Sequence, residues 1–257
     1  MPARAPNHGL ESASHSQADA DSGADLVSVA AIDPARYAWF HGAAIVALVT
    51  MSLAGQTSRL VFGHDRLLGL VRDFDLNNER NVPTWFQSGS LLLGAVLAEL
   101  VNRVRRGRAP DEPRRWRLLA CGLAAMSIDE GVSIHERMTV PIEALRNVPE
   151  FHPFSWVLPG AAIVVLLVAY LRPWVQSLPG RTARLITLAG VLYFGGAVGL
   201  EAAGGVQALT TGINDWLYVW TYTAEETFEM AGMLVLNFAL LEYLSQHGVT
   251  VVASAPE

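Results

Sequence analysis

Acidic side chains recur inside apolar stretches of this sequence, where few basic residues accompany them. Residues 118–137 carry three acids and a histidine, residues 185–205 carry one glutamate, and residues 217–241 carry three glutamates. The groups concerned are Asp129, Glu130, His135, Glu136, Glu201, Glu225, Glu226 and Glu229. Carboxylates and imidazoles bind divalent cations and carry protons. These residue types therefore predict a metal site or a proton site.

Spacing within each stretch indicates which of these side chains share a helix face. At about 100° per residue, Asp129, Ser133 and Glu136 fall on one stripe, with His135 on a different side. In the last stretch, the glutamates stand three and four residues apart and crowd one arc of the helix. Each stretch therefore presents its acids together on a helix that is otherwise apolar.

We interpret the cluster as a divalent-metal site whose metal identity is unknown. Asp129 or Glu136 is expected to act as the base for a water molecule acidified by the metal. The expected ligands are Glu130, His135, Glu201, Glu225, Glu226 and Glu229. In an alternative interpretation, the spans end a turn or two earlier and the acids lie among lipid headgroups.

A second acidic element precedes the second apolar stretch. Oxygen-bearing side chains alternate along it, as at the start of a calcium loop: Asp73, Asp75, Asn77 and Glu79. The loop departs from an EF-hand, because Asn78 replaces the glycine at position six and Thr84 replaces the glutamate at position twelve. The alternative, which we favour, is an Asn/Asp-rich turn with Thr84 capping the following helix.

Composition identifies the elements that must hold these residues. The chain has 257 residues, of which 51% are hydrophobic and 16% charged, and its mean hydropathy is +0.30. These values exclude an ordinary soluble enzyme. A net charge of −6 argues against nucleic acid as a partner, and the single cysteine, Cys121, excludes a disulfide framework and a cysteine-based metal site.

Six apolar stretches predict an all-α, polytopic transmembrane helix bundle. Their approximate limits are 37–57, 85–103, 118–137, 154–171, 185–205 and 217–241. We expect residues 1–35 to form a disordered cytoplasmic tail, because they are rich in Ala, Ser, Asp and Gly without periodicity. Residues 36–246 then form the six-helix transmembrane domain, and residues 247–257 a short C-terminal tail.

Arginines in the connecting loops predict the orientation. Seven arginines lie between the second and third stretches and three between the fourth and fifth. The positive-inside bias places both loops and both termini in the cytoplasm, for a protein of the bacterial cytoplasmic (inner) membrane. This topology brings the acids of three stretches to one depth on the outer side. A carboxylate inside a bilayer costs about 2.5–3.5 kcal/mol, so the cluster needs a cation, shared protons or a water-filled cleft.

Two further patterns concern the packing of helices and the cytoplasmic end of the first span. Gly195 and Gly199 form a G-x-x-x-G pair, with Gly196, Gly204 and Gly205 nearby, which predicts a close helix contact, although glycine is also common in membrane helices. His41 lies near the predicted cytoplasmic end of the first span, away from the acids. We interpret it as an interfacial histidine.

Several segments together resemble those of a group of bacterial six-span membrane proteins with no assigned activity. The segments are Asp75–Ser88, Asp129–Glu136, Trp156–Gly160 and Glu225–Met230. The resemblance covers most of residues 37–245 and implies the same multi-pass topology, but it implies no reaction.

The outline is also loosely similar to the alkaline ceramidase group of membrane hydrolases, in which a buried zinc ion acts on a lipid amide. Those enzymes hold their metal with several histidines, whereas this chain has one well-placed candidate, His135. A ferritin-like di-iron site is similar in its number of carboxylates. Its Glu-x-x-His pairs are absent here, since Glu130 and His135 are five residues apart.

These observations favour a metal-dependent enzyme that acts on a membrane lipid or another apolar substrate. A proton- or cation-coupled transporter is the first alternative, but the fourth and fifth stretches offer almost no polar residues for a route inward. The second alternative is a non-catalytic accessory subunit. In that case we expect an acidic stripe that faces away from the bundle.

Overall fold

The computed structural model describes residues 30–105, 112–135, 137, 156–247 and 252–253. The helices run in chain order as follows: α1 Pro34–Phe62, η1 Leu67–Gly69, α2 Leu70–Asp73, α3 Val82–Arg105, α4 Glu112–Val132, α6 Val157–Ser177, α7 Gly180–Phe194, η2 Gly195–Leu200, α8 Glu201–Thr210 and α9 Trp216–Gln246. Two short strands, β1 Ala30–Ala31 and β2 Val252–Ala253, complete the described elements.

The chain divides into two units, one of which is formed by residues near its two ends. In this unit β1 pairs antiparallel with β2, so that Ala30 lies opposite Ala253. The predicted tail of residues 1–35 falls mostly outside the described residues. The helical unit begins at residue 32, and α1 begins at Pro34, inside that predicted tail. Asp33 caps it, because its carboxylate accepts the Ala35 N–H at 2.8 Å.

Five helical segments of the described chain are long and apolar enough to cross a membrane. They are α1, α3, α6, the continuous run from Gly180 to Thr210, and α9. The prediction of an all-helical membrane protein is thereby confirmed. The predicted third span corresponds to α4, which is not among the five, because arginines occupy its first turns and acids its last. The sixth span therefore stays a prediction.

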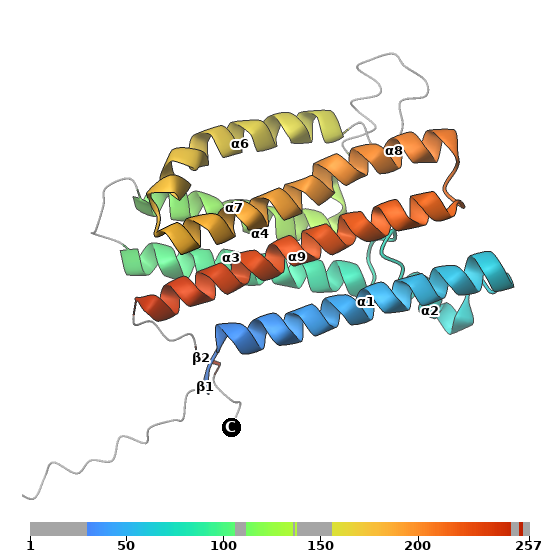
Figure 1. Cartoon of the computed structure of the whole chain (residues 1–257), viewed down its shortest axis with the longest axis horizontal. Helices are drawn as coiled ribbons and strands as arrows, with labels where there is room; N and C mark the ends of the chain where they lie inside the picture. The colour runs from blue at the N-terminus through green and yellow to red at the C-terminus, as the bar shows by residue number, and fades with distance from the viewer. Residues whose placement is uncertain (1–29, 106–111, 136, 138–155, 248–251, 254–257) are drawn as a thin grey trace, which may run out of the picture. The chain divides into compact units, whose positions relative to one another are not determined.

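Helix α9 is the central element of the helical unit. It packs against α1, α3, α7 and α8, while α4 lies along α3, and Figure 1 shows α9 in red running beside these helices. The largest buried side chains of the core are Trp116 on α4, Trp174 on α6 and Tyr243 on α9. The rings of Trp116 and Trp174 meet edge to face, 4.7 Å apart.

Glycines permit the closest helix contacts, but not at the predicted pair. A Cβ at Gly195 or Gly199 would meet nothing within 4 Å, so the predicted G-x-x-x-G contact is wrong. The contact instead uses Gly196, where a Cβ would lie 2.7 Å from the Glu225 carbonyl oxygen, and Gly232, where it would lie 2.7 Å from the Tyr193 backbone nitrogen. The helix changes to π geometry over η2, which moves a different glycine onto the contact face.

His41, which we interpreted from the sequence as an interfacial histidine, is buried between helices. The side chain is only 8% exposed and contacts Tyr37, Phe86 and Ser90 inside the bundle. Helices α3 and α9 cover this face of α1. A position near the end of a predicted span therefore did not mean that the His41 side chain is exposed.

Candidate functional site

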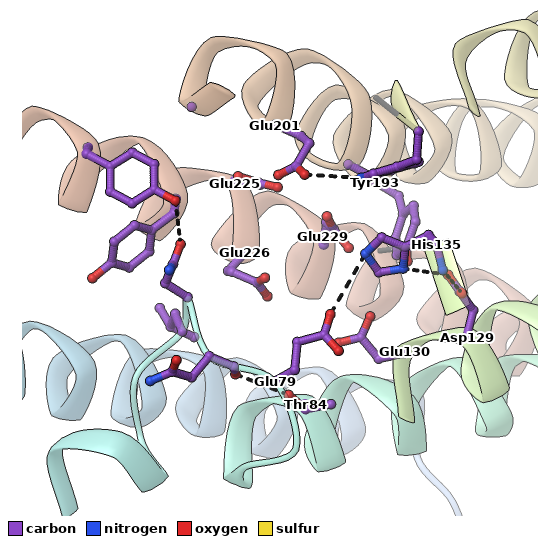
Figure 2. Close-up of a pocket in the computed structure, with 18 residues that line it drawn as sticks. Glu79, Thr84, Asp129, Glu130, His135, Tyr193, Glu201, Glu225, Glu226 and Glu229 are labelled. Atoms are coloured by element: carbon purple, nitrogen blue, oxygen red, sulfur yellow. Dashed lines mark hydrogen bonds and ion pairs between the residues drawn. The ribbon is translucent and has the colours of Figure 1, made fainter. Parts of the chain in front are cut away.

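The acids of the apolar stretches line one cavity of about 300 Å³, where α3 begins, α4 ends and α6 begins. We call it the acidic cavity. Its charged and imidazole groups are Glu79, Asp129, Glu130, His135, Glu201, Glu225, Glu226 and Glu229. Figure 2 shows these side chains around a common space, coming from the loop before α3, from α4 and the residues after it, from α8 and from α9.

The end of α4 fixes the position of His135. Ser133 has a left-handed backbone conformation (φ 56°), and its N–H donates to the Asp129 carbonyl oxygen at 2.6 Å. This terminates the helix and turns the chain back, as glycine does at many helix ends. The backbone N–H of His135 then donates to Oδ1 of Asp129 at 2.8 Å, and its Nδ1 donates to Oδ2 at 2.9 Å.

The helical spacing predicted for residues 129–136 is therefore wrong beyond Val132. His135 lies beside Asp129 and not on another side, because the regular helix ends before it. Both oxygens of Asp129 are occupied by His135, which favours a positioning role over the predicted role as a base. Glu136, the other predicted base, lies outside the described residues.

The imidazole of His135 lies among carboxylates. Its Nε2 is 3.8 Å from Oε1 of Glu79, and its ring meets that of Trp156 edge to face at 4.8 Å. A cation that binds Nε2 would replace any proton on that nitrogen, while Asp129 continues to hold Nδ1.

Glu201 is held at the cavity by the irregular part of the fifth span. It follows η2, whose π geometry ends at Leu200, and it begins α8. Its Oε1 accepts the indole N–H of Trp156 at 3.2 Å. Helix α8 thus supplies a carboxylate that is tied to the start of α6.

Helix α9 supplies three glutamates to the cavity. Glu225 and Glu229 are each 8% exposed, and Glu226 lies between them on the cavity side. The Tyr193 hydroxyl and the Gln87 amide lie next to the Glu229 carboxylate. Tyr222 also lines the cavity and is 4% exposed.

The acidic loop before α3 contains acids with different roles: some hold the turn together, and one lines the acidic cavity. Asp73 is exposed, while Asp75 is buried and accepts the Asn77 N–H at 3.1 Å and the Asn78 amide at 3.0 Å. Burial raises the pKa of Asp75 above 3.8, against the lowering effect of the Asn77 N–H and other neighbours. These contacts support the turn interpretation of the loop.

The structure adds three contacts of this loop. The cap of α3 is Asn81, whose Oδ1 accepts the Thr84 N–H at 3.2 Å, so the predicted cap by Thr84 is wrong. Glu79, the last acid of this loop, lines the acidic cavity beside His135. Asn77 joins the loop to α9, because it accepts a hydrogen bond from the Tyr218 hydroxyl at 3.0 Å.

The cavity thus collects every predicted site residue of the apolar stretches that the structure describes. The sequence did not indicate Tyr193, Trp156 or Tyr222, since an aromatic residue in an apolar helix carries no signal of a site. Among the described residues, no three His, Cys, Asp or Glu side chains lie close enough together to hold a metal ion.

Comparisons with known proteins place the chain in a family. A family model described as Domain of unknown function (DUF8692) matches residues 39–244, which include every described element that lines the acidic cavity. No curated protein and no solved structure matches the chain.

Proposed function

The chain belongs to the family defined by this domain of unknown function, DUF8692, and we propose that it is a membrane enzyme that binds a divalent cation in the acidic cavity. Its substrate is a lipid or another apolar molecule. We place the protein in the bacterial inner membrane, with the cavity on the outer side and both termini in the cytoplasm. The arginine-rich loops support this orientation.

The observation that carries the proposal is the excess of negative charge at one place. Seven carboxyl groups and one imidazole line the cavity, and no Lys or Arg is among its described lining residues. Buried carboxylates repel one another unless protons or a cation separate them. A divalent cation accounts for several of them together.

The types of side chain around the cavity, several carboxylates and one imidazole, are those that bind divalent cations. Because Asp129 holds Nδ1 of His135, the other ring nitrogen is turned toward Glu79 and the cavity. Metal-binding histidines commonly have such a carboxylate behind them, which fixes the ring and its tautomer. Candidates for the oxygen ligands are Glu79, Glu130, Glu226 and Glu229, with Glu201 and Glu225 bordering the same space.

A bound cation supplies Lewis-acid activation of a substrate oxygen. The residues of the chain do the rest. His135 and Asp129 keep the cavity wall fixed, and the remaining carboxylates are available to accept a proton at their oxygens. Trp156, Tyr193 and Tyr218 line the same space and offer apolar ring surface to a substrate chain.

The accessory-subunit alternative predicts acids that face outward. The described acids instead line an internal cavity, and Glu225 and Glu229 are more than nine-tenths buried. This arrangement favours the binding of something small over the docking of a basic protein partner.

Elemental analysis of the detergent-purified protein tests the proposal. We expect stoichiometric divalent metal in the wild type and its loss in the double variant Glu226→Gln, Glu229→Gln. The matched control is Glu99→Gln on α3, because Glu99 hydrogen-bonds Asn102 at 2.8 Å and does not line the cavity. Metal content unchanged by the double variant, or no metal in any preparation, contradicts the proposal.

Activity is tested separately with the metal-loaded protein. Hydrolysis of vesicle lipids is followed by mass spectrometry, with the double variant as the negative control. Metal without turnover would leave a cation-binding protein and remove the enzymatic part of the proposal.

A further inference from the structure

Exposed apolar side chains gather where the chain leaves α1 and enters α2. They are Val61 and Phe62 at the end of α1 and Leu67, Leu68 and Leu70 in η1 and α2, and each is at least 47% exposed. We call these five residues the leucine hook. None of them lines the acidic cavity. Large apolar side chains that are exposed together mark a surface that contacts a membrane or another protein.

The chain folds back along α1 at the leucine hook. Gly63 takes a left-handed conformation (φ 67°) and ends α1. Farther along, Val71 packs on Gly55, since a Cβ at Gly55 would lie 3.5 Å from the Val71 Cα, and the Leu76 N–H donates to the Ser52 hydroxyl oxygen at 3.2 Å. Figure 1 shows α2 beside the last turns of α1. The segment after Gly63 therefore runs alongside a helix that is long and apolar enough to span the membrane.

This return places the leucines at the boundary between headgroups and acyl chains. Helix α1 has 29 residues and is therefore about 43 Å long, against about 30 Å for the hydrocarbon layer. Its last turns reach that boundary. Phe62 lies about 10 Å along the helix from Gly55, and the hook lies within this distance. Interfacial segments bury their apolar side chains to a similar depth, about 5–10 Å.

The backbone of the hook is strained at two of its leucines. Leu67 has φ 38° and Leu68 has φ 60°, in the region where glycine is the usual residue. Leu68 is 102% exposed, so its side chain gains no packing within the helical unit. A leucine that is strained and makes no internal contact indicates that its side chain is used outside the chain.

The surface around the hook indicates that lipid covers it. Val61 and Phe62 continue the exposed apolar side of α1, which also carries Val46 and Met51. At about 100° per residue, Phe62 lies about 20° from Met51 around the helix, and Val61 about 60° from Val46. The hook thus extends the surface that α1 presents to acyl chains.

Charged residues of both signs flank the leucines. Asp65 and Arg66 precede Leu67, and Arg72 and Asp73 follow Leu70, and all four are exposed. Apolar side chains beside exposed charges are typical of segments that lie in the membrane interface, with the charges among the headgroups.

We propose that the leucine hook inserts into the membrane leaflet on the side of the acidic cavity, where acyl chains cover its apolar side chains. The charges of Asp65, Arg66, Arg72 and Asp73 stay among the headgroups. The chain continues from the hook to Leu76 and Glu79, which line the cavity. The hook therefore holds this wall of the cavity at the membrane surface.

Spin labels on the full chain in liposomes test this inference. Cys121, the single cysteine, is replaced by alanine, and Leu68→Cys carries the nitroxide. Power-saturation EPR measures collisions of the nitroxide with oxygen, which concentrates in the bilayer, and with a water-soluble nickel complex. We expect more oxygen collisions and fewer nickel collisions than at Asn214→Cys, an exposed polar position in the turn before α9. Val46→Cys, 67% exposed on α1, is the lipid-facing reference.

Leu67→Cys provides a second labelled position in case Leu68→Cys does not fold. Nickel collisions at the hook equal to those at Asn214 would place it in water and overturn the inference. Few collisions with either reagent would mean that protein, for instance a second copy of this chain, covers the hook, which also overturns it. The labelled positions do not line the acidic cavity, so the result is independent of the metal proposal.

Discussion

The two ends of the helical unit are built for different tasks. At one end Trp116, Trp174 and Tyr243 are at most 2% exposed and pack ring against ring. At the other end the same helices, α4, α6 and α9, border a cavity lined by carboxyl groups. The comparison indicates that packing at the aromatic end stabilises the bundle, which lets the acidic end keep groups that repel one another.

The largest expected effect tests the aromatic end. Trp116→Ala removes a 0% exposed indole that contacts Trp174 and Tyr243, and we expect the free energy of unfolding to fall by about 3–5 kcal/mol. Denaturant titration in detergent measures it. Trp39→Ala, at a position 68% exposed in the helical unit, is the control and changes stability little. Equal losses in both variants would show that the aromatic end is not the stabilising one.

A second prediction concerns the support of His135 at the acidic end. Asp129→Asn weakens the hydrogen bond to Nδ1 of His135, which fixes the imidazole. We therefore expect the affinity for a divalent metal to fall about 10–100-fold. Calorimetric titration with Zn²⁺ and with Mn²⁺ measures it. Exposed Asp73→Asn is the control. An unchanged affinity in Asp129→Asn would separate the Asp129–His135 pair from metal binding.

A third prediction has the opposite sign to the first. Glu226→Gln removes one of the repelling carboxyl groups, so the metal-free protein is expected to gain about 0.5–2 kcal/mol of stability. Thermal unfolding in the presence of chelator measures it. Glu99→Gln, outside the cavity, is not expected to stabilise. A loss of stability in Glu226→Gln would mean that the acidic end is not under electrostatic strain.

The smallest effect concerns the loop that supplies Glu79. Burial raises the pKa of Asp75 above 3.8, so the folded protein holds this proton more tightly than the unfolded chain does. The resulting stabilisation is present below pH 3.8 and is lost as the pH rises through the raised pKa. Asp75→Asn should flatten this part of the stability profile. Melting temperatures measured across the acidic range test it, and an identical slope in the variant contradicts it.

Much of the fold could be predicted from hydropathy. The last predicted span, 217–241, corresponds to α9, Trp216–Gln246, and the fifth, 185–205, falls within the run from Gly180 to Thr210. The third was displaced, because 118–137 was predicted and α4 ends at Val132. Ser133 takes the left-handed conformation there, and not Gly131 two residues before it, so the sequence did not locate the turn.

The sequence predicted which residues belong to the site better than it predicted how those residues contact one another. Acids in apolar helices stand out because burying their charge is costly, so their presence implied a shared site. The sequence contains no comparable signal for contacts between different helices and loops. The sequence did not show that Glu79 lies beside His135, and it placed His135 on another side of the helix from Asp129, whereas all three line the cavity together.

By itself, then, the sequence determined that the chain is a helical membrane protein and that three of its apolar segments carry acids, because hydropathy and charge are properties of each segment alone. Only the tertiary structure decided which side chains meet. The π geometry of η2 selects Gly196 for the contact with α9, and α3 and α9 bury His41. Such contacts depend on the relative rotation and depth of packed helices, which no single segment specifies.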